Sequence, residues 1–495
     1  MYYRGVAPNP PFLVYRSNLL DCPFPAPTGR FHFVPTKTAR GVFNTSLNSV
    51  WPVVGPHIRD HVNARKIKYS VIVPARFVTH DQEGDTMGPV VVWMFVYPNS
   101  TTAEDAFNAT PGILSILDSH GIQGASVEWS EGVVEMKPTF HLRCFLTTAL
   151  GMSVTKDEME VTDAQGSVAF FFHENQDEHG APSDKVFGVS NCHVLHGSPS
   201  VDYKLHPASC RIQRVRLAGL RRYQRGLEET KMAVAGHAKK AEGLVKQIDL
   251  LQQTPTIDDP NEAEELAKAH CDRSVVETFL VDMQTKWSDL DFRNIGHVHW
   301  APRISVDVQD TNYTRDLATF EVEERKFKPC FKGNVLDLGH YSPGELAGKF
   351  YSLRLDDQRA FKWPLNGQLR IKGYKNGHPC FVVMKDGSTT DLTVGNHAGL
   401  EAFLCNPQGV ESVDLAFFNY CSEDRPFSTR GDSGSLIVNG KGEMVGILHS
   451  GIFRESTFNK RHATFPHISF ATPAWWVRKQ LKTMYPHADF DRTTF

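Results

Sequence analysis

The sequence predicts a mainly β protein with a small α/β domain at its N-terminal end and a helical hairpin inserted into its β region. Three observations lead to this fold class. Strand and helix patterns alternate up to about residue 145, short strands separated by turn residues dominate from about residue 150, and apolar residues recur at helical spacing over 215–291. At 495 residues the chain is too long for one hydrophobic core, so several domains are expected.

Composition and charge are those of an ordinary globular protein. Hydrophobic residues make up 41% and charged residues 22% of the chain, and the formal net charge of −3 gives no reason to expect nucleic acid or a membrane as a partner. No apolar run approaches the roughly 20 residues of a membrane span, and no secretory signal is visible. Nine cysteines are scattered singly without a CxxC pair, which predicts reduced thiols and a cytoplasmic location.

The N-terminal region, residues 1–145, is predicted to be an extended arm followed by the α/β domain. Residues 1–50 are rich in proline and aromatic residues and show few periodic signals, so we expect them to lie against a neighbouring domain. Two buried strands, a helix with one apolar side and a third strand should follow, over 68–78, 90–97, 101–120 and 125–136. No catalytic constellation is visible in this region.

The β region begins with a strand that leads into a histidine. Residues 185–190 are predicted to form this strand, after an earlier one over 167–173, and the polar turn Asn191-Cys-His-Val-Leu-His-Gly197 follows at once. A histidine held at a tight turn is well placed to act as a general base. We favour His193, which comes directly after the strand, over His196; the alternative is that both are packed loop histidines.

Residues 215–291 interrupt the β pattern with two helical segments. The segment Pro255-Thr-Ile-Asp-Asp-Pro260 separates them, which predicts an antiparallel helical hairpin. Its charged residues are interpreted as a solvated face. Its apolar stripes must be buried, so self-association or binding of a protein partner through 215–291 is expected.

Strand patterns resume after the hairpin and bring further polar residues. His297 and His299 lie two apart in a predicted strand over 295–300, but without a third ligand we interpret them as a packed or surface pair and expect neither a metal nor a cofactor. Asp316 stands just before the apolar strand that ends at residue 322, where a carboxylate can orient an imidazole.

The last part of the chain reads as a second β region that contains a glycine-flanked serine. Strands are expected over 369–375, 380–385, 389–394, 400–404, 413–420, 435–439, 444–448 and 467–471, followed by a helix over 473–484. Between them stands Thr429-Arg-Gly-Asp-Ser-Gly-Ser-Leu-Ile-Val438. Gly431 and Gly434 permit a tight turn that presents Ser433, and the N–H groups of Gly431 and Ser433 can converge as an oxyanion site requires.

Three stretches, SNCHVLHG, TRDLATFEV and TRGDSGSLIV, stand in the order His193, Asp316, Ser433. They resemble the three catalytic blocks of the trypsin-like (chymotrypsin-fold) serine proteases, and the FKGNVLDLG, GDSGS and SFATP stretches resemble those of long intracellular members. The resemblance implies a chymotrypsin-like double β-barrel. The first barrel would then occupy 146–214 and 292–350, with the hairpin inserted between them, and the second barrel with a C-terminal helix would occupy 351–495.

The resemblance also implies roles for individual residues. Ser433 would be the nucleophile, His193 the base and Asp316 the residue that orients it, with an oxyanion hole formed by Gly431 and Ser433. The chain would be a serine endopeptidase acting on a polypeptide substrate. The residues expected to bind that substrate are Phe427, Ser428, His449, Ser450 and Gly451. Phe427 takes a place where members specific for basic residues have an aspartate, which argues against cleavage after Arg or Lys.

Some features depart from the family pattern. Ser435 replaces the second glycine after the nucleophile, and Val194 and Thr429 stand where the family has disulfide cysteines. No Arg-Ile-Val-Gly-Gly activation site is present, so Asp432 cannot be assumed to pair with a freed N-terminus, and whether the enzyme needs an activation trigger stays open. The alternative is a catalytically silent peptide-binding scaffold that assembles through its helical hairpin.

Overall fold

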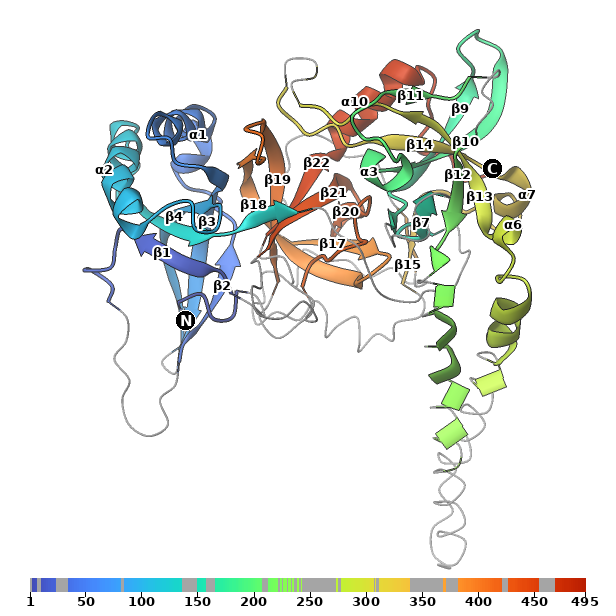
Figure 1. Ribbon diagram of the computed structural model, residues 1–495, viewed down its shortest axis with the longest axis horizontal. Coiled ribbons are helices and arrows are strands. Elements are labelled where there is room, and N and C mark those ends of the chain that lie inside the picture. The colour runs from blue at the N-terminus through green and yellow to red at the C-terminus, as the bar shows by residue number, and fades with distance from the viewer. Residues whose placement is uncertain are drawn as a thin grey trace, which may run out of the picture.

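The structure is a computed structural model, and Figure 1 shows its elements. Residues described are 2–6, 10–23, 34–81, 84–135, 149–156, 165–206, 212–220, 277–306, 308, 311–338, 368–370, 382–420, 426–453 and 468–495, with scattered residues of 223–242 and 273–274. No helix in these parts of the chain is both long and apolar enough to cross a membrane.

The N-terminal region forms a sheet covered on one face by two helices. Its elements are β1 (Phe12–Arg16), β2 (Thr36–Arg40), α1 (Leu47–Ala64), β3 (Tyr69–His80), β4 (Asp85–Val96), α2 (Ala103–Ser119) and β5 (Ser126–Glu131). Strands β4 and β5 are parallel and α2 connects them, while the other pairs are antiparallel. Thr102 and Asp105 form a capping box that fixes the start of α2. The predicted strands and helix of this region therefore lie close to their expected positions.

Helix α1 differs from the sequence-based expectation. We expected residues 1–50 to form an extended arm, yet α1 begins at Leu47 and continues through Pro52 and Pro56. Prolines remove backbone donors and ordinarily interrupt a helix. Here a buried stripe that includes Trp51 and Ile58 packs on the sheet and α2, and this burial outweighs the missing hydrogen bonds. The arm itself contributes strands β1 and β2 to the sheet.

A second sheet of eight strands curls back on itself. Its strands are β7 (Ser153–Lys156), β8 (Gly166–Ser167), β9 (Phe170–Gln176), β10 (Pro182–Ser190), β11 (Tyr203–Lys204), β12 (Arg214–Leu217), β13 (Asn294–Ala301) and β14 (Ala318–Val322). The two ends of its strand order, β8 and β9, are consecutive in sequence. Between them, the Val168 N–H donates to Met152 O and the Ala169 N–H donates to Val189 O, which draws the two edges together.

The C-terminal part forms a ring of six strands. They are β17 (Val382–Gly387), β18 (Asp391–Cys405), β19 (Glu411–Asn419), β20 (Leu436–Asn439), β21 (Met444–Phe453) and β22 (Ile468–Pro473), and helix α10 (Ala474–Met484) follows. The order β18-β17-β20-β21-β22-β19 is closed by pairing between β18 and β19. Strand β18 is one long strand where the sequence suggested two, over 389–394 and 400–404.

Strand pairing joins the ring to the N-terminal sheet. Phe403 and Leu404 of β18 pair with Ile72 and Val71 of β3, so these parts form one 12-stranded sheet. A short strand, β6 (Val133–Glu135), pairs with the end of β21. The smaller elements are α3 (Cys192–Leu195), α6 (Leu290–Arg293), α7 (Glu324–Phe327), β15 (Val335–Asp337) and β16 (Gln368–Arg370). Strand β16 is the described part of the predicted strand 369–375.

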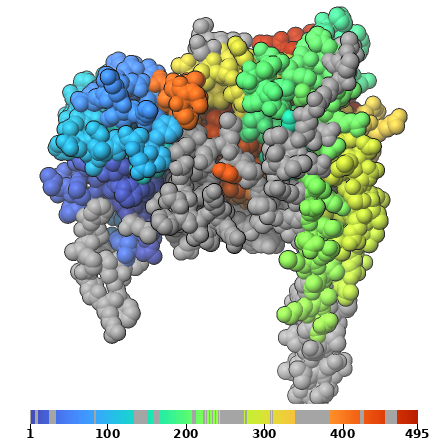
Figure 2. Space-filling view, in the orientation of Figure 1, coloured from blue at the N-terminus to red at the C-terminus, as the bar shows by residue number. Residues whose placement is uncertain are grey.

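The described residues of the predicted hairpin are largely helical, and its arms leave the body of the molecule side by side (Figures 1 and 2). The Tyr223 hydroxyl donates to Met283 O at 2.6 Å, which joins one arm to the other. The first residues of the predicted span, 215–217, belong to β12, which pairs with β13. The insertion thus begins and ends on neighbouring strands. The predicted break at 255–260 lies outside the described residues.

Candidate active site

His193 and Asp316 are brought together at the edge of the second sheet. Strand β10 ends at Ser190, and the chain turns into α3, which carries His193. The Asn191 side chain donates to Asp316 O at 2.7 Å, and the His193 N–H donates to Asp316 Oδ1 at 3.1 Å. The imidazole Nδ1 contacts Asp316 Oδ2. Backbone and side chain of His193 are therefore both held by the same carboxylate.

The carboxylate of Asp316 is kept ionised although its side chain is only 2% exposed. Burial alone would raise its pKa, but the charge and hydrogen bonds of His193, together with the charge of His449, outweigh burial and hold the pKa below its ordinary value. A buried carboxylate on Nδ1 fixes the imidazole tautomer that leaves Nε2 as an acceptor. Nε2 of His193 is buried and has no hydrogen-bond partner among the described residues.

Ser433 lies on a turn that packs against the same part of the second sheet. The Ser167 N–H donates to Ser433 O at 2.7 Å, and the Ser190 hydroxyl donates to Ser167 O at 2.7 Å. A Cβ on Gly434 would come within 2.4 Å of the Ser190 hydroxyl, so only glycine fits there. The turn thus reaches the strand end that precedes His193. No hydrogen bond joins the described side chains of Ser433 and His193.

Two backbone donors of the glycine turn have no acceptor among the residues that the structure describes. Gly431 and Gly434 have φ values of 94° and 84°, a region that favours glycine. The N–H groups of Asp432, Gly434 and Ser435 all donate to backbone carbonyls. The N–H groups of Gly431 and Ser433 donate to no acceptor among the described residues. These are the two donors that the sequence suggested for an oxyanion hole.

The predicted substrate-binding residues have varied surroundings. Phe427 is fully buried and packs against Phe417 in a core cluster of the six-stranded ring, and the Ser428 hydroxyl shares a 2.7 Å hydrogen bond with Ser469. Ser450 and Gly451 lie on β21, where the Ser450 hydroxyl is buried without a partner among the described residues.

His449 lies beside a buried carboxylate, a pairing that sequence reasoning missed. Its Nε2 lies 3.5 Å from Asp414 Oδ1, a distance at which the attraction is mainly coulombic. Burial alone would lower the pKa of His449, but Asp414, and then Asp316, outweigh it and raise that pKa above the ordinary value. A carboxylate in the alternating strand β19 was the only available signal, and its partner cannot be read from local spacing.

The other histidines singled out by sequence contact residues other than Asp316. His196 Nδ1 contacts Gln213 Oε1 at 3.0 Å and its ring stacks on Tyr203, as expected for a packed loop histidine. His299 Nδ1 contacts the Tyr485 hydroxyl at 2.6 Å, and His297 faces Glu321. Across the described residues, no group of three or more His, Cys, Asp and Glu side chains has the arrangement of a metal site.

No protein-family model matches the chain, and no curated protein sequence matches it. Several solved structures that are similar to it are those of proteases. Nocardiopsis protease (NAPase) has a TM-score of 0.29 and 12% identity, with 68% of this chain and 96% of that chain covered. A glutamic acid-specific serine protease described as using a histidine triad in substrate binding has a TM-score of 0.28, 11% identity and coverages of 70% and 100%. Thermobifida fusca protease A has a TM-score of 0.28 and 9% identity, with 68% of this chain and 96% of that chain covered.

Proposed function

We propose that this chain is a serine endopeptidase that hydrolyses peptide bonds through His193, Asp316 and Ser433. The observation that carries this proposal is the buried, ionised Asp316 bound to His193 Nδ1, with Nε2 of the same ring left without a partner. An imidazole oriented in this way can accept a proton only at Nε2, which is the task of the base in a Ser-His-Asp triad. The turn that presents Ser433 packs against the strand end that precedes this histidine.

The chemistry then follows from the groups present. The Ser433 hydroxyl attacks the carbonyl carbon of the scissile bond while its proton passes to His193 Nε2. The N–H groups of Gly431 and Ser433 stabilise the oxyanion, and each such donor is worth about 10²–10³ in kcat. Collapse of the tetrahedral intermediate returns the proton to the leaving amine and leaves an acyl-enzyme on Ser433. Water, deprotonated by His193, then hydrolyses that ester.

The substrate in this proposal is an extended polypeptide. An extended chain binds most readily by adding to a strand edge, and β21 lies next to the glycine turn, because the Gly434 N–H donates to Leu448 O at 2.8 Å. Ser450 follows on the same strand and is the proposed backbone partner. Gly451, also expected to bind substrate, is already paired on both sides, with Ser469 of β22 and Glu135 of β6, so it offers no open strand edge. The buried Phe427 in place of an acidic residue still argues against cleavage after Arg or Lys.

A fluorophosphonate probe, which reacts with activated serines, tests the proposal. The purified wild-type chain should be labelled on Ser433, and Ser433→Ala should abolish both labelling and peptide hydrolysis while the fold is kept. Ser49→Ala, which removes an exposed hydroxyl in α1, is the matched control and should behave as wild type. Equal labelling of Ser433→Ala would refute the proposal. An unlabelled wild-type chain that still binds peptides would favour the peptide-binding scaffold.

A further inference from the structure

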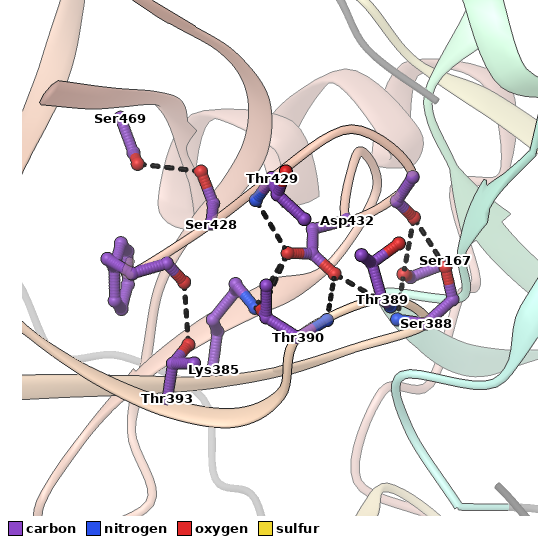
Figure 3. Close-up of polar contacts among 12 residues, drawn as sticks. Ser167, Lys385, Ser388, Thr389, Thr390, Thr393, Ser428, Thr429, Asp432 and Ser469 are labelled. Carbon is purple, nitrogen blue, oxygen red and sulfur yellow. Dashed lines mark hydrogen bonds and ion pairs between the residues drawn. The ribbon is translucent and has the colours of Figure 1, made fainter. Parts of the chain in front are cut away.

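The carboxylate of Asp432, the residue before the proposed nucleophile, is fully buried and lies in a network of polar groups (Figure 3). Oδ1 accepts hydrogen bonds from the N–H groups of Thr389 and Thr390 at 2.9 and 3.1 Å. Oδ2 accepts from the Thr390 hydroxyl at 2.7 Å and from the Thr429 N–H at 2.9 Å. A buried carboxylate needs such donors and an opposite charge, because burial of an unpaired ion is costly.

Lys385 supplies the opposite charge from within the chain. Its ammonium nitrogen lies 3.1 Å from Asp432 Oδ2, and both side chains have 0% exposure. The same ammonium donates to the Thr390 hydroxyl at 2.6 Å. Lys385 lies within β17, with β18 on one side and β20 on the other, so the strands of the ring fix its position.

Two further hydroxyls, from the turn between β17 and β18, hold the backbone of the glycine turn. The Thr389 hydroxyl donates to Arg430 O at 2.8 Å, and the Ser388 hydroxyl donates to Gly431 O at 2.5 Å. In a planar trans peptide the N–H points opposite to the carbonyl of the same unit. Holding the Arg430 carbonyl therefore points the Gly431 N–H away from the turn between β17 and β18. That N–H is one of the two donors of the glycine turn that have no acceptor among the described residues.

We propose that Lys385, Ser388, Thr389 and Thr390, here called the cradle, are positioning residues that set the Gly431 N–H for oxyanion binding. The inference rests on the proposed function and adds how its oxyanion hole is kept in place. Lys385 is the counter-ion of Asp432, so the turn does not need an amino terminus released by cleavage as the partner of this carboxylate. This accounts for the absence of the Arg-Ile-Val-Gly-Gly activation site from the sequence.

The decisive variant is Thr389→Val, which removes one hydroxyl at nearly constant shape and keeps the backbone N–H to Asp432. With a peptide substrate, kcat should fall about 10- to 100-fold while KM stays within about twofold of wild type. This loss is smaller than that caused by removing a donor outright, because the N–H is misaimed and not deleted. Thr389→Ser should restore kcat. Thr230→Val is the matched control, since it removes a buried hydroxyl that donates to Gly226 O at 2.8 Å in the hairpin insertion.

Crystal structures of wild type and Thr389→Val provide a readout that does not require activity. The Arg430–Gly431 peptide should keep its orientation in wild type and rotate or become mixed in the variant. The inference would be overturned if the Arg430–Gly431 peptide unit had the same orientation in the variant as in wild type. It would also be overturned if wild type were active and the variant had the same kcat. If wild type hydrolyses no peptide, the proposed function fails, and the two crystal structures still decide the role of the cradle.

Lys385→Met tests the charge. Without the ammonium, the Asp432 carboxylate has no opposite charge in this buried site, so kcat should fall while KM stays close to that of wild type. An unchanged kcat would count against Lys385 as the counter-ion. If this variant does not fold, the Thr389 series still decides the proposal.

Discussion

Replacement of His449 by glutamine should reveal a pH-dependent contribution to stability. In the folded chain Nε2 of His449 lies 3.5 Å from Asp414 Oδ1, and both residues are buried. Asp414 also accepts hydrogen bonds from Thr314, from its N–H at 3.2 Å and its hydroxyl at 2.6 Å. His449→Gln keeps a polar side chain of similar size but removes the positive charge. Removing one partner of a buried pair costs about 3–5 kcal/mol, because the other charge stays buried.

The sign of the pH dependence follows from the raised pKa of His449. Burial would lower this pKa, but Asp414 and Asp316 raise it above the ordinary value of 6.5. A group whose pKa is higher in the folded than in the unfolded chain stabilises the fold fully below its unfolded pKa. That stabilisation is lost as pH rises through the folded pKa. The stability difference between wild type and His449→Gln should therefore be largest near pH 6 and shrink towards alkaline pH.

Urea unfolding at a series of pH values from 6 to 10 measures this difference. Because a chain with several cores need not unfold in one step, transition midpoints are compared at each pH before any free energy is extracted. His57→Gln removes an exposed histidine of α1 and should leave the midpoint nearly unchanged at every pH. A wild-type advantage that is constant with pH, or that grows as pH rises, would refute the assignment of His449 as a buried cation.

Two further predictions concern the proposed catalysis and the insertion. Asp316→Asn should preserve the fold yet lower kcat about 10⁴-fold in steady-state assays, because the amide favours the wrong imidazole tautomer. Normal turnover would show that another carboxylate orients His193. Asp307 and Asp310, both outside the described residues, are the candidates. Replacing residues 225–281 with a short Gly/Ser linker keeps the contact between Tyr223 and Met283 and should leave a chain that is still labelled on Ser433. Light scattering should then show a changed oligomeric state, or protein cleavage should change; an unlabelled, unfolded product would make the insertion part of the core.

Local sequence patterns predicted most strands and the contact between His193 and Asp316. Alternating apolar residues and turn glycines determine where strands begin and end, and the polar residues just beyond strand ends gather at one edge of a sheet. Helix α1 could not be predicted in this way, because its two prolines argue against a helix and its stabilising partners, β3 and α2, are distant in sequence. The same holds for β18, whose long span depends on pairing with β3, β17 and β19.

Lys385 shows where local reading stops. A lysine after Val382, Val383 and Met384 breaks an apolar strand, and from sequence alone it resembles the end of that strand reaching solvent. In the structure its side chain is fully buried because Asp432, which is remote in sequence, supplies the charge that makes burial tolerable. A charged residue inside an apolar run is therefore a sign of a partner elsewhere, but the partner becomes visible only when the strands are assembled.

The relative position of Ser433 and His193 depends on contacts between the eight-stranded second sheet and the six-stranded ring of the 12-stranded sheet. Ser167, on β8, donates through its N–H to Ser433 O and through its hydroxyl to Gly431 O at 3.3 Å. The Ser388 N–H in turn donates to the Ser167 hydroxyl at 2.9 Å. One serine of the second sheet therefore contacts both the glycine turn and the cradle. Because His193 follows β10 of that same sheet, a shift between the sheets would separate the proposed base from the proposed nucleophile. The proposed catalysis thus depends on the docking of the two sheets, and Ser167 is the residue through which that docking reaches the turn.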